Sequence, residues 1–107
     1  MRHARSVDRI ALSPSGTVIR LTEERWFHIT ESHDEMAGHA STVLSAIEAP
    51  DFVADGWEGE LIAVKRLKGR HVVVVFREVG ADDGFVITAF FTRDVHRWAK
   101  RNRVWPP

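Results

Sequence analysis

The chain has 107 residues, a formal net charge of zero at pH 7 and no cysteine. This length supports one domain with a single hydrophobic core, without disulfides or metals to hold it together. The absence of cysteine excludes disulfides, thiolate metal sites and thiol nucleophiles. It suits a reducing cytoplasm, which is the location we expect. No apolar run is long enough to span a membrane, so we expect no membrane partner.

The charged residues are unevenly distributed along the chain. Residues 22–60 contain ten acidic side chains and one basic side chain, Arg25. Residues 65–70 contain four basic and no acidic side chains, and residues 93–107 contain five basic side chains and one acidic side chain. This pattern predicts either a molecule with one basic surface or acidic and basic segments that neutralise each other in the folded state.

The first predicted elements are a strand and a helix. We expect residues 1–16 to be an N-terminal extension or an edge segment, ending in the turn Ser13-Pro14-Ser15-Gly16. The β-branched run 17–21 predicts a strand. Thr22 then has the chemistry of a helix N-cap, and acidic residues follow it in the first turn, where the helix dipole favours them.

The predicted first helix carries two histidines on different sides. At 100° per residue, His33 shares a side with Trp26 and Ile29, whereas His28 lies on the opposite, polar side. We therefore expect His28 to face outward and His33 to face the core. A second helix is predicted from Asp34 to Glu48, because its apolar residues recur at helical spacing.

The remainder of the chain predicts mostly strands. Short β-rich runs at 51–57, 60–67, 71–76 and 85–92 predict strands. The run 71–76 (HVVVVF) is apolar on both faces, which predicts a central strand covered on both sides. The last three strands are joined by short connections, which favours an antiparallel meander. A short basic helix follows within the tail 93–107. The prediction is an α+β fold with a strand, two helices, an antiparallel sheet of about four strands and a short C-terminal helix, in which residues 17–92 form the domain.

Six histidines are present, but the spacing of His28, His33 and His39 matches no common set of metal ligands. Phosphate-binding loops and dinucleotide fingerprints are also absent from the sequence. We therefore expect neither a metal nor a cofactor.

The polar residues that remain suit metal-independent cleavage of RNA. That reaction needs groups that move protons and cations or donors that stabilise the charge developing on phosphorus. Histidine can move the protons, and Lys or Arg on a strand can bind phosphate oxygens. The residues on the predicted first helix and strands that could take these roles are His28, Lys65, Arg66, His71, Arg77 and Thr88. The residue types are common on solvated surfaces, so composition alone leaves both interpretations open.

A family resemblance favours the RNA-cleaving interpretation. The segments 25–29 (RWFHI), 33–36 (HDEM), 49–51 (APD) and 86–90 (VITAF) resemble phage- and toxin-associated domains of the barnase, EndoU, colicin nuclease and RelE-like superfamily. The resemblance covers about residues 17–92. The chain departs from that pattern where Asp34 follows His33, where Ala49 replaces a commoner Asn, and in having no tyrosine.

The resemblance implies an endoribonuclease-like domain, plausibly a toxin, that forms a 2′,3′-cyclic phosphate and is restrained by an antitoxin or immunity protein. His28 would be the general base or acid and His33 a support. The resemblance also implies Thr88 as a hydrogen-bond donor and one basic strand residue, either Lys65 or Arg66, which lie on opposite faces of one strand. Arg77, chosen from the residues alone, is expected to bind the phosphate as well.

Further basic and aromatic side chains are candidates for RNA binding, because aromatic rings stack on bases and cations contact phosphates. The alternative to an enzyme is a non-catalytic module of the same fold that binds RNA or protein. The candidate RNA-binding residues are Arg25, Lys68, Arg70, Arg97, Trp98 and Arg101.

Overall fold

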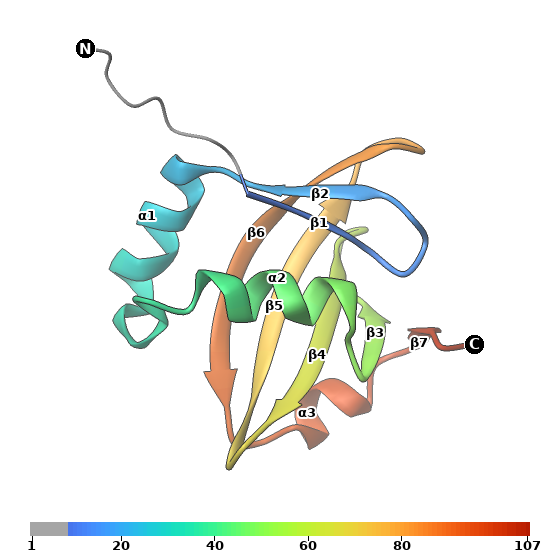
Figure 1. The fold of residues 1–107 in the computed structure, drawn as a ribbon. Coiled ribbons are helices and arrows are strands. Elements are labelled where there is room, and N and C mark those ends of the chain that lie inside the picture. The colour runs from blue at the N-terminus through green and yellow to red at the C-terminus, as the bar shows by residue number, and fades with distance from the viewer. Residues whose placement is uncertain (1–8) are drawn as a thin grey trace.

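The computed structural model describes residues 9–107 (Figure 1). Of the predicted extension or edge segment at residues 1–16, residues 1–8 lie outside this part, and Arg9–Leu12 form an outer strand of the sheet. In chain order the elements are β1 (Arg9–Leu12), β2 (Val18–Leu21), α1 (Glu23–Ser32), the 3₁₀-helix η1 (Asp34–Met36), α2 (Ala40–Glu48), β3 (Phe52–Asp55), β4 (Leu61–Leu67), β5 (Arg70–Glu78), β6 (Asp83–Thr92), α3 (His96–Ala99) and β7 (Arg103–Trp105).

The chain is α+β, but the predicted sheet of about four antiparallel strands is wrong. Seven strands form one mixed sheet in the order β1-β2-β6-β5-β4-β3-β7. The strand β2 is parallel to β6, with Arg20 opposite Phe85, and the other neighbours are antiparallel. The helices between β2 and β3 provide the long connection that a parallel pair needs. The sheet therefore includes one strand that precedes residues 17–92 in the sequence, β1, and one that follows them, β7.

One face of the sheet, called the helix face below, is covered by α1 and α2 (Figure 1). Apolar residues of α2, including Val43 and Ile47, pack there against alternate residues of the central strands, such as Val72 and Val74. Alternation along a strand sends every second side chain to the same face. The helix face therefore contains the larger core, which is formed by the packing of the helices on the sheet.

The opposite face, called the second face, has a smaller core that is covered partly by α3. Val64, Val73 and Val75 pack there against Trp98, which is 5% exposed. Because residues Val72–Phe76 are buried on both faces, β5 is the central strand that the run HVVVVF predicts.

The predicted continuous helix from Asp34 to Glu48 is wrong. The chain forms η1, turns at Gly38 and begins α2 at Ala40. Gly38 has φ of +84°, a conformation that ends a helix and favours glycine. This break sets α2 across the sheet rather than in line with η1 (Figure 1).

In the part of the chain that the structure describes, no helix is both long and apolar enough to cross a membrane.

Candidate nucleic-acid interface at the basic end of the sheet

The turn between β4 and β5 collects basic side chains at one end of the sheet. Leu67 pairs with Arg70 across a tight turn whose Gly69 has φ of +79°. The guanidinium of Arg93, which follows β6, donates to the Gly69 carbonyl at 3.2 Å. Lys68, in the same turn, is exposed. Two segments of the basic sequence therefore meet at one place, which we call the basic end: Arg66, Lys68, Arg70, His71 and Arg93.

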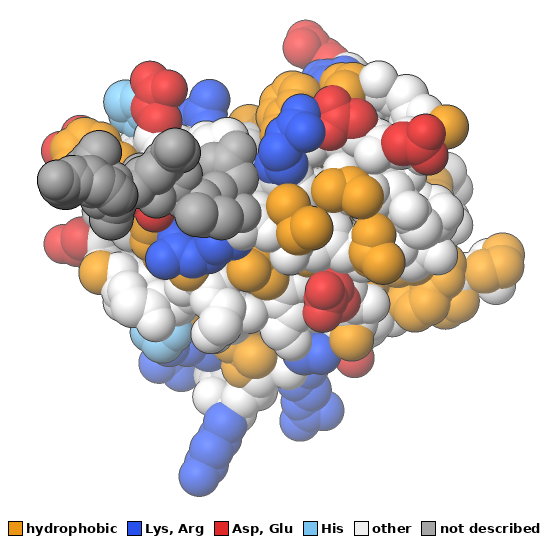
Figure 2. Space-filling model, turned by 45° about the horizontal axis from the view of Figure 1, so that its top comes forward, with side chains coloured by type: hydrophobic (Ala, Val, Ile, Leu, Met, Phe, Trp, Pro, Cys, Tyr) orange, Lys and Arg blue, Asp and Glu red, His pale blue; other side chains and the backbone are white. Residues whose placement is uncertain are grey.

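The space-filling view agrees with this grouping. Figure 2 shows Lys and Arg side chains projecting at its lower end, where Figure 1 places both the β4–β5 turn and α3. Elsewhere in that view acidic and basic groups are mixed. A chain with zero net charge thus has a local basic surface, which can attract a polyanion when the whole molecule does not.

Arg70 is held in a defined orientation at the basic end. Its guanidinium carbon lies 3.5 Å from the centroid of the Phe91 ring, a stacking arrangement that Arg makes readily. Arg70, Phe91, Thr92 and Arg93 line a small hollow of about 120 Å³. Two guanidinium groups beside one hollow suit an anion such as a phosphate group, because each can donate two hydrogen bonds to it.

A row of three polar side chains crosses the second face at this end of the sheet, on the face opposite to Arg70 and Phe91. In the strand register Arg66 lies opposite His71, and His71 lies opposite Thr92. Directly opposed residues have Cβ atoms about 4.5–5.5 Å apart. The Thr92 hydroxyl accepts a hydrogen bond from the Asp94 amide at 3.0 Å. An imidazole and a guanidinium are thus neighbours on the exposed part of the sheet.

His28 lies elsewhere, on the outward side of α1. The cap formed by Thr22, whose hydroxyl accepts from the Arg25 amide at 3.0 Å, starts this helix where the sequence predicts. His28 has 55% of its side chain exposed, and its Nε2 is 4.0 Å from a carboxylate oxygen of Glu24. Within residues 9–107 it forms no hydrogen bond or ion pair with a strand residue. Arg25 is also exposed on α1.

His33 ends α1 and lies against the sheet, although it is not deeply buried. Its ring is 5.5 Å from that of Phe90 on β6, and its Nδ1 is 3.9 Å from a Glu35 carboxylate oxygen. The side chain is 36% exposed. His33 therefore lies at the border between core and solvent, which suits the supporting position expected for it.

Lys65 and Arg66 point to opposite faces, as their alternation predicts. The Lys65 ammonium donates to the Ala49 carbonyl at 2.7 Å, next to the C-terminus of α2. A cation at that point satisfies a free carbonyl and complements the helix dipole. Lys65 thus has a structural partner on the helix face, whereas Arg66 is exposed on the second face.

Arg77 lies at the opposite end of β5, far along the strand from the basic end. It donates to the Glu58 carbonyl at 3.1 Å and approaches the Glu60 carboxylate at 3.9 Å. Backbone amide donors, first that of Glu60 itself and then those of Glu58 and Trp57, lower the pKa of the Glu60 carboxyl, and the Arg77 charge adds to them against a smaller effect of burial. Arg77 therefore supports the 56–60 loop.

Thr88 lies on the second face opposite Val75, at an irregularity in the β5–β6 register. The structure therefore places His28, Lys65, Arg77 and Thr88 on different parts of the molecule, and only Arg66 of the predicted catalytic residues lies at the basic end.

The predicted RNA-binding residues separate in the same way. Lys68 and Arg70 are at the basic end, whereas Trp98 is in the core of the second face, 5.6 Å from the Phe90 ring. Arg97 lies over Trp98 at 5.0 Å. Arg101 donates to the carbonyls of Asp55 and Gly56 at 2.6 and 2.8 Å. A buried indole has no face free for a base.

The sequence offered His71 as one of several polar strand residues but did not single it out as catalytic, and it did not indicate Thr92 or Arg93. The signal that could have found them is the alternation along β4 and β5, which puts Arg66 and His71 on the same face once the Lys68-Gly69 turn fixes their register. Trp57, with 60% exposure, is the exposed indole that was also missed. It lies in a glycine-flanked turn, with the Arg101 guanidinium 3.9 Å from its ring.

In residues 9–107 no three histidine, aspartate or glutamate side chains come together as metal ligands would. The comparisons with known proteins find no match: no protein-family model, no curated protein and no solved structure is significantly similar to the chain.

Proposed function

We propose that the protein binds RNA through its basic end. The observation that carries this proposal is that Arg66, Lys68, Arg70 and Arg93 lie around the β4–β5 turn at one end of the sheet, with Arg70 and Arg93 lining the same small hollow. Contacts to phosphates supply most of the sequence-independent affinity for nucleic acid. RNA, rather than DNA, is the ligand implied by the resemblance to ribonuclease domains.

The binding is tested by fluorescence anisotropy with a labelled RNA oligonucleotide, and a DNA of the same sequence is the comparison ligand. Combined replacement of Arg66, Arg70 and Arg93 by Ala removes three cations that can neutralise phosphates. The slope of log affinity against log salt should become shallower by about 0.7 for each phosphate of a single strand that is no longer neutralised. The matched control is Arg9→Ala on the outer strand β1, which should leave the slope unchanged. An equal change in both variants, or none in the triple variant, would contradict the proposal.

Cleavage of the bound RNA is the second candidate function, and the position of His71 favours it. His71 lies between Arg66 and Thr92 in the strand register, so a phosphate bound by Arg66 is near an imidazole. In the proposed step the 2′-oxygen forms a bond to phosphorus and its proton moves to His71. The bond from phosphorus to the 5′-oxygen breaks, and that oxygen takes a proton from water. The product is a 2′,3′-cyclic phosphate, and Arg66 stabilises the developing charge.

Cleavage is tested with end-labelled RNA in the presence of EDTA. Loss of cyclic-phosphate ends in His71→Ala but not in His28→Ala would support His71 as the proton carrier. The reverse result would support His28, the residue that the resemblance implies. Intact RNA with every protein, including the wild type, would leave the protein a binding module.

The proposed RNA ligand also suggests a cellular location and a protein partner. An RNA ligand and a chain without cysteine fit a cytoplasmic location, which we propose. An antitoxin or immunity protein that restrains this domain would cover the basic end with acidic side chains, because complementary charge steers such partners together.

A further inference from the structure

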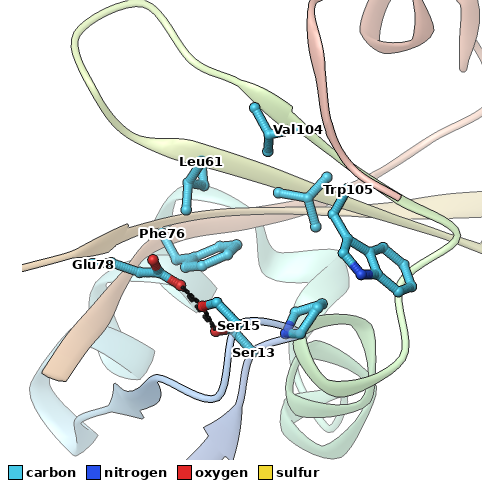
Figure 3. Close-up of a pocket in the computed structure, with 9 residues that line it drawn as sticks. Ser13, Ser15, Leu61, Phe76, Glu78, Val104 and Trp105 are labelled. Carbon is cyan, nitrogen blue, oxygen red and sulfur yellow. Dashed lines mark hydrogen bonds between the residues drawn. The ribbon is translucent and has the colours of Figure 1, made fainter. Parts of the chain in front are cut away.

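A separate hollow lies at the other end of the same strands, on the helix face. Its volume is about 310 Å³, near the lower limit of small-molecule sites in proteins. Its floor is apolar, with Leu61 and Phe76 from β4 and β5 (Figure 3). The walls are the β1–β2 loop on one side and β7 on the other, contributed by Ser13, Pro14, Ser15, Val104 and Trp105.

One charged group, Glu78, lines this mainly apolar hollow. The hydroxyls of Ser13 and Ser15 donate to the same carboxylate oxygen, Oε2, at 2.9 and 2.8 Å. Figure 3 shows these bonds and shows the other carboxylate oxygen turned away from both serines. Within residues 9–107, no basic side chain forms an ion pair with Glu78 and Oε1 has no hydrogen-bond partner.

This arrangement defines what the hollow can accept. Each serine has one hydroxyl hydrogen, and both are used on Oε2, so these groups have no donor left for a ligand. A carboxylate only accepts hydrogen bonds. A ligand with a donor, best of all a cationic one, would therefore match this carboxylate, whereas an anion would meet repulsion. The apolar floor and the Trp105 wall would cover a hydrocarbon body.

We propose that the hollow between the β1–β2 loop and β7 binds a small organic ammonium ion, with its apolar body on Phe76 and Leu61 and its ammonium on Glu78. The two serines hold the carboxylate in place before the ligand arrives, which reduces the entropy lost on binding. The loop that carries them is itself fixed, because the Ser13 amide donates to the Thr17 carbonyl at 2.9 Å and the Gly16 amide to the Ser13 carbonyl at 2.8 Å. This inference is independent of RNA binding.

The test uses three probes of similar shape: 2-phenylethylamine, neutral 2-phenylethanol and the anion 3-phenylpropionate. Each is titrated into the ¹⁵N-labelled protein, and the amide signals of residues 13–15 and the indole signal of Trp105 are followed. The amine should shift these signals and bind at least about tenfold more tightly than the other two, because a charge-assisted hydrogen bond is the difference between them. Equal affinity for amine and anion, or no shift at these signals, would overturn the proposal.

Variants locate the interaction. Glu78→Gln keeps the shape and removes the charge, so it should weaken the amine at least about tenfold. Glu48→Gln, on the exposed side of α2, is the matched control and should not change the affinity. If Glu78→Gln does not fold, Val104→Trp provides the second test, because residue 104 is 40% exposed and a larger ring there blocks the hollow. Undiminished amine binding by Val104→Trp would overturn the site.

Discussion

The two ends of β4 and β5 differ in the segments that surround them. At one end the β4–β5 turn is exposed, hydrogen-bonded to the rest of the fold through Arg93, and basic side chains surround it. At the other end the β1–β2 loop and β7 fold over the sheet and leave an apolar hollow of about 310 Å³ with one carboxylate. The strands β4 and β5 therefore carry a surface suited to a polyanion at one end and a hollow suited to a small cation at the other.

The two ends differ in how far their binding surfaces depend on the packing of the core. Basic side chains on an exposed turn contribute charge without depending on close packing, so they can meet phosphates in many arrangements. The hollow depends on buried strand residues such as Phe76, which is 1% exposed, so its shape is part of the core. We expect changes at the basic end to alter binding with little effect on stability, and changes at the hollow to alter both.

The largest effect on stability is expected at the floor of the hollow. Phe76→Ala removes a ring from the core of the helix face and should lower the free energy of unfolding by about 3–5 kcal/mol, measured by urea denaturation. Lys68→Ala, at the exposed β4–β5 turn, should change it by less than about 0.5 kcal/mol. Similar losses of stability in the two variants would contradict the proposed difference between the two ends.

An intermediate effect is expected from two neighbours on β4. Lys65→Met removes the hydrogen bond to the Ala49 carbonyl and should cost about 0.5–1.5 kcal/mol of stability while RNA affinity is kept. Arg66→Met should do the opposite: stability is kept, and the salt slope of RNA binding falls by about one unit or less. Urea denaturation measures the stability of the two variants, and fluorescence anisotropy measures their affinity for RNA. If Lys65→Met weakened RNA binding as much as Arg66→Met, Lys65 would belong to the interface after all.

The smallest effect is expected at Glu60, in the loop next to the hollow. Its pKa is lowered in the folded protein, so the ionised carboxylate stabilises the fold above the pKa of an unfolded glutamate. That contribution is lost as pH falls through the lowered, folded-state pKa. Glu60→Gln should therefore be less stable than wild type at neutral pH, and the difference should shrink towards about pH 3. A difference that stays constant with pH would show that the carboxylate charge is not the cause.

Local patterns predicted the middle of the chain well. The Thr22 cap, the polar side of α1 that carries His28, and the buried strand β5 all follow from side-chain chemistry within a few residues. The opposite faces of Lys65 and Arg66 follow from alternation alone. These features depend on neighbours in sequence, which is why the sequence predicts them.

The outer strands could not be predicted in this way. The strands β1 and β7 have four and three residues, and each exists because it pairs with a strand elsewhere in the fold. The parallel pairing of β2 with β6 joins Val18 to Asp83, a long-range contact without a local signal. The break at Gly38 did have a signal, a glycine within the supposed helix, which the helical spacing of the apolar residues outweighed.

The candidate site shows the same limit. Lys68 and Arg70 were recognised because they lie in one charged run, but Arg93 joins them only through its bond to the Gly69 carbonyl. Trp98 was expected to stack on RNA because basic residues surround it in sequence. The structure uses its ring to fill the core of the second face, which composition could not reveal.

The most direct test of the central claim is a titration of a short RNA into the ¹⁵N-labelled protein, with EDTA present and His71→Ala used if the wild type cuts the RNA. Binding at the basic end predicts that the largest signal changes occur at Lys68, Gly69, Arg70, residue 71 and Arg93, and that the α1 signals around His28 move little. Changes centred on α1, or none at the β4–β5 turn, would contradict RNA binding at the basic end.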